Sequence, residues 1–75
     1  MGRPTQVTNA IRLLRFAHGE MTQAELTDRI GVTRQTIIAI EQGRYSPSLE
    51  MAFRIARVFG VQLDEVFQYP DSPEI

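Results

Sequence analysis

The chain has 75 residues, enough for one small domain with a lean core. It lacks cysteine, which excludes disulfides and cysteine-based zinc sites, and no apolar run approaches the roughly 20 residues of a membrane span. The net charge of −1 is unevenly spread along the chain. All eight basic residues are arginines before residue 58, and the charged residues within 63–75 are all acidic. A basic end remains compatible with a nucleic-acid partner, and we expect a cytoplasmic protein.

The chain begins with residues 1–8, MGRPTQVT, which we expect to form a flexible lead before a domain over residues 9–69. A first helix is predicted over Asn9–His18, with Thr8 as its N-cap. Four apolar residues recur there at helical spacing and are expected to face the core, with Ile11 beside them: Ala10, Leu13, Leu14 and Ala17. His18 is expected to be exposed in the turn that follows, without partners for a metal or catalytic role.

The stretch between Thr22 and Gly43 predicts two short helices joined by a tight turn. Thr22 and Glu25 have the spacing of a capping box at the start of the first helix. Gly31 suits the left-handed position that ends this helix, and Thr33 is the N-cap of the second. Two helices across a glycine-containing turn are typical of a DNA-binding helix-turn-helix, whose second helix lies in the major groove.

The second helix of this pair, residues 34–42, has one apolar side and one outer side. Helical periodicity places Ile37 and Ile40 on the buried side. The outer side carries residues of mixed chemistry, namely Arg34, Gln35, Ile38, Ala39 and Gln42. Arginine and glutamine can form paired hydrogen bonds with guanine and adenine edges. A solvated amphipathic helix would show the same periodicity, but the caps, the turn and the outer side together favour DNA binding.

Residues 49–59 predict a further helix that Ser48 caps and Gly60 ends. Its apolar stripe is expected to be core and comprises Leu49, Ala52, Phe53, Ile55, Ala56 and Phe59. Met51 and Val58 fall on the opposite side, either simply exposed or bordering a partner surface. A last short helix is predicted within residues 61–69, and we expect residues 70–75 to be a disordered tail.

Several blocks in the same order give the chain a specific resemblance. TQAEL, IGVTRQTI, IEQGRYSPSLE, IARVFGV and LDEVF are similar to the XRE family, the lambda-type repressor and Cro class of regulators, over about residues 10–67. The resemblance implies a compact, all-α, five-helix lambda-repressor-like domain. It also implies a transcriptional regulator, most often a repressor, that binds double-stranded DNA as a homodimer at a near-palindromic operator. No enzyme activity, cofactor or metal is expected.

The resemblance also implies roles for individual residues. The base-reading positions are Arg34, Gln35, Ile38 and Ala39. The positions expected to contact phosphate are Gln23, Thr33, Thr36, Gln42, Arg44, Tyr45 and Ser46. A structural ion pair is expected between Arg15 and Glu41. The dimer interface is expected to include Met51, Val58, Val61, Val66, Phe67 and Tyr69.

Three points stay open from the residues alone. Ala39 can offer a base only apolar contact with a thymine methyl group, and Ile38 either faces the groove or supports a neighbour. Leu63 and Phe67 could close the monomer core instead of a dimer interface. An alternative function is an antitoxin-like interaction module, which binds a protein partner through the acidic C-terminal segment and also binds its own promoter.

Overall fold

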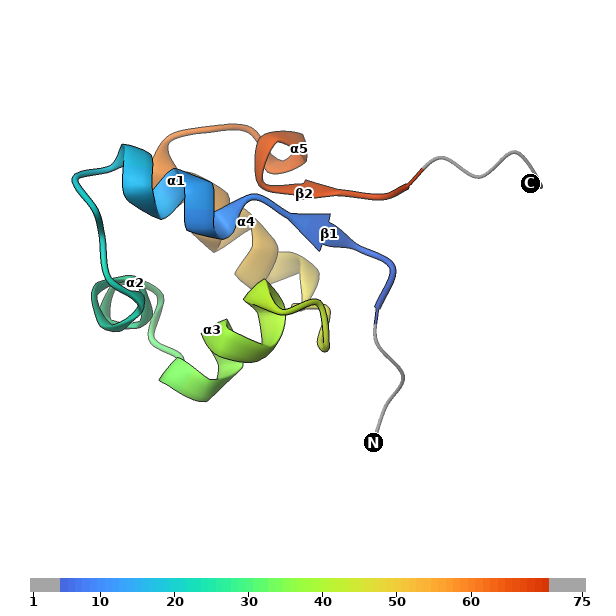
Figure 1. Cartoon of the computed structure of the whole chain (residues 1–75), viewed down its shortest axis with the longest axis horizontal. Coiled ribbons are helices and arrows are strands. Elements are labelled where there is room, and N and C mark those ends of the chain that lie inside the picture. The colour runs from blue at the N-terminus through green and yellow to red at the C-terminus, as the bar shows by residue number, and fades with distance from the viewer. Residues whose placement is uncertain (1–4, 71–75) are drawn as a thin grey trace.

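The computed structural model describes residues 5–70 of the chain. Its elements, in order, are β1 (Thr8–Asn9), α1 (Ile11–Ala17), α2 (Gln23–Ile30), α3 (Arg34–Glu41), α4 (Leu49–Phe59), α5 (Leu63–Val66) and β2 (Phe67–Gln68) (Figure 1). The predicted five-helix fold is confirmed, with a small antiparallel two-stranded sheet added to it. Residues 1–4 of the expected lead and 71–75 of the expected tail lie outside the described residues.

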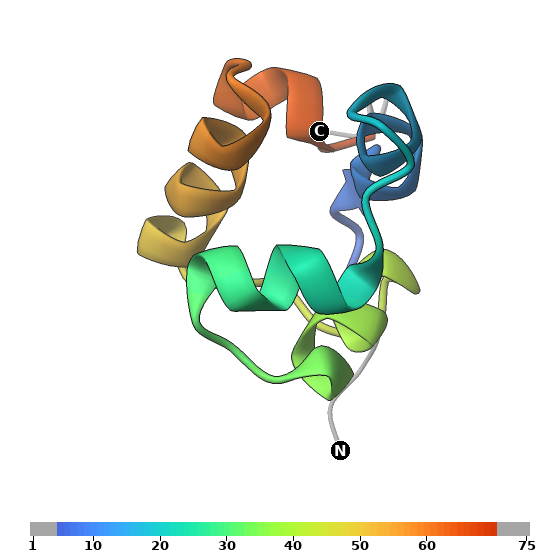
Figure 2. The same ribbon diagram turned by 90° about the vertical axis from the view of Figure 1, so that its left-hand side faces the viewer.

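The five helices enclose one core, to which each of them contributes. The fully buried side chains are Ile11, Leu26, Ile30, Ile37, Ile40, Ile55 and Val66. Helix α2 packs against α3 and α4, and α4 packs against α5. In Figure 2, α2 crosses the face turned to the viewer, with α3 below it and α5 at the top. None of the helices within residues 5–70 is long and apolar enough to cross a membrane.

The capping signals in the central stretch are formed as the sequence predicts. The Glu25 N–H donates to Thr22 Oγ1 at 3.0 Å, and the Thr22 N–H donates to Glu25 Oε1 at 2.9 Å. Gly31 has φ of 74°, in the left-handed region where a side chain is strained. Thr33 Oγ1 accepts the Thr36 N–H at 3.3 Å and so starts α3. These local contacts define the start of α2, its end at Gly31 and the start of α3.

The start of α1 differs from the prediction, because a long-range strand pairing takes its first residues. Thr8 pairs with Gln68 in the sheet instead of capping a helix, and α1 begins at Ile11. The Ala10 N–H donates to the Val66 carbonyl at 2.8 Å, which draws this segment toward β2. Thr5 also donates its N–H to the Gly43 carbonyl at 3.2 Å. Residues 5–8, which we expected to belong to a flexible lead, therefore lie against the domain.

The buried faces of α1 and α4 are narrower than predicted. Leu13 is 72% exposed and Ala17 is also exposed, while Ile11 is the buried residue of α1. In α4, Leu49 is 68% exposed and Phe53 is 50% exposed. Helical periodicity predicts most of the buried stripe of α4, but it misplaces the buried face of α1, which lies at Ile11 and not at Leu13 and Ala17. The packed neighbours, which periodicity does not show, decide which residues are covered. Both helices consequently leave large apolar side chains at the surface.

Candidate nucleic-acid interface

Helix α3 presents the four expected base-reading residues on the side away from the core. Arg34 and Gln35, at its start, are exposed, whereas Ile38 and Ala39 are half-buried. Ile37 and Ile40 on the opposite side are fully buried in the core. The helix lies at the end of the molecule opposite α5 (Figures 1 and 2). It can therefore approach a partner without rearrangement of the core.

Arg15 and Glu41 form a two-pronged ion pair between α1 and the end of α3. Arg15 Nε donates to Glu41 Oε2 at 2.9 Å, and Arg15 Nη2 donates to Glu41 Oε1 at 3.1 Å. A third donor, Arg15 Nη1, reaches the Met21 carbonyl at 2.9 Å. The side chains are only 15% and 10% exposed. This pair joins α1, the α1–α2 turn and α3, which is a structural role.

Gln23, the first residue of α2, extends this network to Arg34, one of the expected base-reading residues. Its Nε2 donates to Glu41 Oε1 at 3.3 Å, and its Oε1 accepts from Arg34 Nε at 3.4 Å. The hydrogen bonds thus run from Arg15 through Glu41 and Gln23 to Arg34. Gln23 sits at a helix N-terminus, where free N–H groups favour phosphate, and it contacts Arg34, which is expected to read a base.

A polar hollow of about 740 Å³ opens between α1, the start of α2 and α3. Its lining residues are Asn9, Arg12, Arg15, Thr22, Gln23, Ala24, Arg34, Ile38, Glu41 and Gln42. The hollow brings Arg34 and Ile38, which are expected to read bases, together with the phosphate candidates Gln23 and Gln42. Arg12 is a lining residue to which the sequence assigned no role, although it lies three positions before Arg15 and so on the same helix face.

The remaining phosphate candidates lie at the two ends of α3. Thr33 and Thr36 share a hydrogen bond of 2.9 Å between their hydroxyl oxygens at its start. Beyond its end, the Arg44 N–H donates to the Ala39 carbonyl at 3.0 Å, and the Arg44 and Tyr45 side chains are exposed. Ser46 is exposed as well, but it lines a different, apolar groove.

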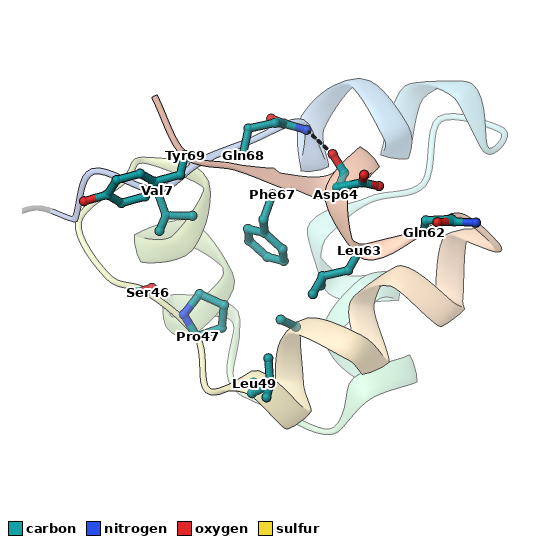
Figure 3. A pocket seen from close by; sticks show the side chains of 11 residues that line it. Val7, Ser46, Pro47, Leu49, Gln62, Leu63, Asp64, Phe67, Gln68 and Tyr69 are labelled. Carbon is teal, nitrogen blue, oxygen red and sulfur yellow. Dashed lines mark hydrogen bonds between the residues drawn. The ribbon is translucent and has the colours of Figure 1, made fainter. Parts of the chain in front are cut away.

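This apolar groove, of about 590 Å³, separates β2 and α5 from the start of α4 (Figure 3). Phe67 and Leu63 point into it, toward Pro47 and Leu49 on the other side. Tyr69, which is 63% exposed, lies at its edge. The groove contains two of the six residues expected at a dimer interface, Phe67 and Tyr69, and adds Leu49 and Leu63.

The other residues expected at a dimer interface lie elsewhere. Val66 is fully buried in the monomer core, so its assignment to an interface is wrong for this conformation. Met51, Val58 and Val61 are half-buried and pack against the core outside the groove. Val66 is the last residue of α5 and stands next to the apolar Phe67, and sequence pattern alone could not show that its side chain turns inward. Leu49 was not predicted as an interface residue because helical periodicity placed it in the core stripe of α4.

Known proteins resemble this chain in sequence and in fold. A family model described as helix-turn-helix matches residues 11–66. An HTH-type transcriptional regulator of Methanocaldococcus jannaschii is 49% identical over 64 residues, which cover 85% of this chain and 96% of that protein. The CTXphi phage transcriptional repressor RstR of Vibrio cholerae is 36% identical over 59 residues, or 79% of this chain and 52% of RstR.

A solved structure extends the comparison to the backbone. A protein from Bacteroides fragilis superposes with a TM-score of 0.72 at 22% identity, over 83% of this chain and 98% of that one. At this identity the likeness shows the shared fold. The matched residues 11–66 run from the first residue of α1 to the last residue of α5 and include the whole α2–turn–α3 unit. The chain belongs to the XRE-type helix-turn-helix family of DNA-binding transcriptional regulators, a family of binding proteins and not of enzymes.

Proposed function

We propose that the protein represses transcription by binding a near-palindromic DNA operator as a homodimer, with α3 of each copy in the major groove. The observation that carries the proposal is the start of α3, where Arg34 and Gln35 are exposed beside the Thr33 cap. Both side chains can form paired hydrogen bonds with purine edges, Arg34 with guanine and Gln35 with adenine. Ile38 and Ala39, half-buried on the same side, then contact bases through apolar groups.

Phosphate contacts on both flanks of α3 would set its register in the groove. Gln23 at the start of α2 lies on one flank, with Thr33, Thr36 and Gln42 along α3 itself. Arg44 and Tyr45 lie on the other flank, in the loop after Gly43. Contacts to phosphate position a protein on the duplex, while base contacts carry the sequence choice. The relative RstR is a phage repressor, which supports repression as the direction of regulation.

The second copy would dock at the apolar groove that contains Phe67 and Tyr69. A two-fold dimer uses the same patch on both copies, and this groove offers an apolar hollow next to exposed apolar side chains, Leu49 and Tyr69. Side chains of one copy can therefore fill the groove of the other. Such a dimer would present two recognition helices to successive major grooves about 34 Å apart.

The decisive experiment is a selection of random duplexes by the purified protein at two salt concentrations. An enriched inverted repeat, with half-sites about one helical turn apart, is the expected result. Binding that enriches no sequence and disappears uniformly as salt rises would contradict sequence-specific recognition. A single enriched half-site without a repeat would leave base reading intact and contradict the dimer.

Arg44→Ala is expected to weaken binding to all duplexes alike. A lost phosphate contact lowers the slope of log affinity against log salt by about 0.9 and leaves base preference unchanged. Fluorescence anisotropy over a salt series, on the selected operator and on a scrambled duplex, measures both quantities. Arg57→Ala is the matched control, since it removes one exposed arginine from the last turn of α4. The end of α4 lies away from α3 (Figure 2). Equal slopes for the two variants would contradict the Arg44 assignment.

Tyr69→Ala is expected to weaken self-association. Removing an interface aromatic of this kind costs about 1 kcal/mol, or roughly fivefold in the dimer dissociation constant. Sedimentation equilibrium of the parent and the variant measures that constant. Phe16→Ala is the control, because Phe16 is a similarly exposed aromatic on α1, outside the groove. If Phe16→Ala raises the dimer dissociation constant and Tyr69→Ala does not, the dimer uses a different face of the molecule.

A further inference from the structure

The polar hollow contains more positive charge than its own carboxylate can balance. Among residues 5–70, its lining includes three arginines, Arg12, Arg15 and Arg34, and one acid, Glu41. Arg15 donates two hydrogen bonds to Glu41 and a third to the Met21 carbonyl. Arg15 and Glu41 therefore neutralise each other, and the hollow keeps the charges of Arg12 and Arg34.

The side-chain donors of Arg12 are available to a binding partner, whereas those of Arg15 are already used. Within the described part of the chain, Arg12 is exposed and forms no ion pair or side-chain hydrogen bond. Glu41 cannot readily recruit it, because both Glu41 oxygens already accept from Arg15 and one also accepts from Gln23. Arg12 thus lines the hollow, and within the described residues its side-chain donors are unused.

The position of Arg12 is set by its neighbour one turn along α1. Arg12 and Arg15 lie three residues apart and share one face of the helix. The ion pair with Glu41 holds this face against the end of α3, so Arg12 lies beside the same opening as Gln23 and Arg34. The hollow consequently joins α1 to the surface that α2 and α3 present.

We propose that Arg12 is a DNA-backbone contact, whose guanidinium binds a phosphate of the duplex that α3 enters. This inference rests on the proposed function and extends its interface from the helix-turn-helix to α1. A guanidinium binds phosphate oxygens with two parallel N–H donors, which suits a side chain that lines an open, positively charged hollow. Arg44 lies in the loop beyond the C-terminal end of α3, and Arg12 would add a separate backbone contact from α1.

The test compares the full-length parent with Arg12→Ala, Arg12→Lys and Arg57→Ala, after circular dichroism has confirmed that each is folded. Each protein is titrated into the selected operator and a scrambled duplex between 50 and 200 mM salt. Arg12→Ala is expected to bind both duplexes more weakly, by a similar factor. Its affinity should fall about three- to fourfold less than the parent's across this salt range, as one lost phosphate contact requires.

The controls separate a phosphate contact from a general charge effect. Arg57→Ala removes the same charge and should keep the parent's salt dependence, while Arg12→Lys should keep most of it because the cation remains. Equal salt dependence for Arg12→Ala and Arg57→Ala would overturn the inference. A changed base preference in Arg12→Ala would also overturn it. A parent that prefers no duplex would instead overturn the proposed function, which is a distinguishable failure.

Discussion

Replacing Glu41 with alanine is expected to destabilise the fold by about 3 kcal/mol. The change would leave the Arg15 guanidinium, which is only 15% exposed, without its carboxylate partner. A buried charge that loses its partner costs about 3–5 kcal/mol, and we take the lower end because water reaches part of this pair. Gln23 Nε2 would lose its acceptor at the same time. Urea unfolding of the parent and the variant measures the difference.

Matched variants test whether the loss comes from the pair. Glu20→Ala removes an exposed carboxylate from the α1–α2 turn and is expected to change stability by less than about 0.5 kcal/mol. The double variant Arg15→Met with Glu41→Leu removes both charges and should recover part of the loss, because apolar pairs can replace buried ion pairs. A cost for Glu41→Ala below about 1 kcal/mol would show that the pair behaves as a solvent-exposed one.

The sequence predicts helix ends well where the signals are local. Thr22 with Glu25, and Thr33, form their caps within four residues, and Gly31 ends α2 in the left-handed conformation. The start of α1 could not be predicted in this way. It depends on the hydrogen bond between Ala10 and Val66, which are far apart in the sequence and are brought together by the fold. A two-residue strand such as β1 carries no periodic signal of its own.

The candidate site follows the same division between local and tertiary information. Helical periodicity alone separates the exposed Arg34 and Gln35 from the buried Ile37 and Ile40. The contacts of Gln23 with Glu41 and Arg34 join α2 to both ends of α3 and could be seen only in the fold. The fold also shows that Val66 faces inward. The proposed dimer surface is therefore the apolar groove that contains Phe67 and Tyr69.

Arg34→Ala is expected to weaken binding to the selected operator by about 1–3 kcal/mol and to relax the choice of base at one position in each half-site. The side chain is exposed at the first residue of α3, and a guanidinium that bonds two acceptors of one guanine discriminates against other bases. The measurement is a competition assay, in which the parent and the variant bind the operator and each of its single-base-pair changes.

Two further variants tell base reading from a general loss of charge. Arg34→Lys keeps the charge but lacks the planar pair of donors, so we expect its base preference to fall toward that of Arg34→Ala while its salt dependence stays near the parent's. Arg44→Ala should show the reverse pattern, with the base preference kept and the salt dependence reduced. If Arg34→Ala discriminates among the operator changes as sharply as the parent does, Arg34 does not read a base, and Gln35 becomes the first residue to test.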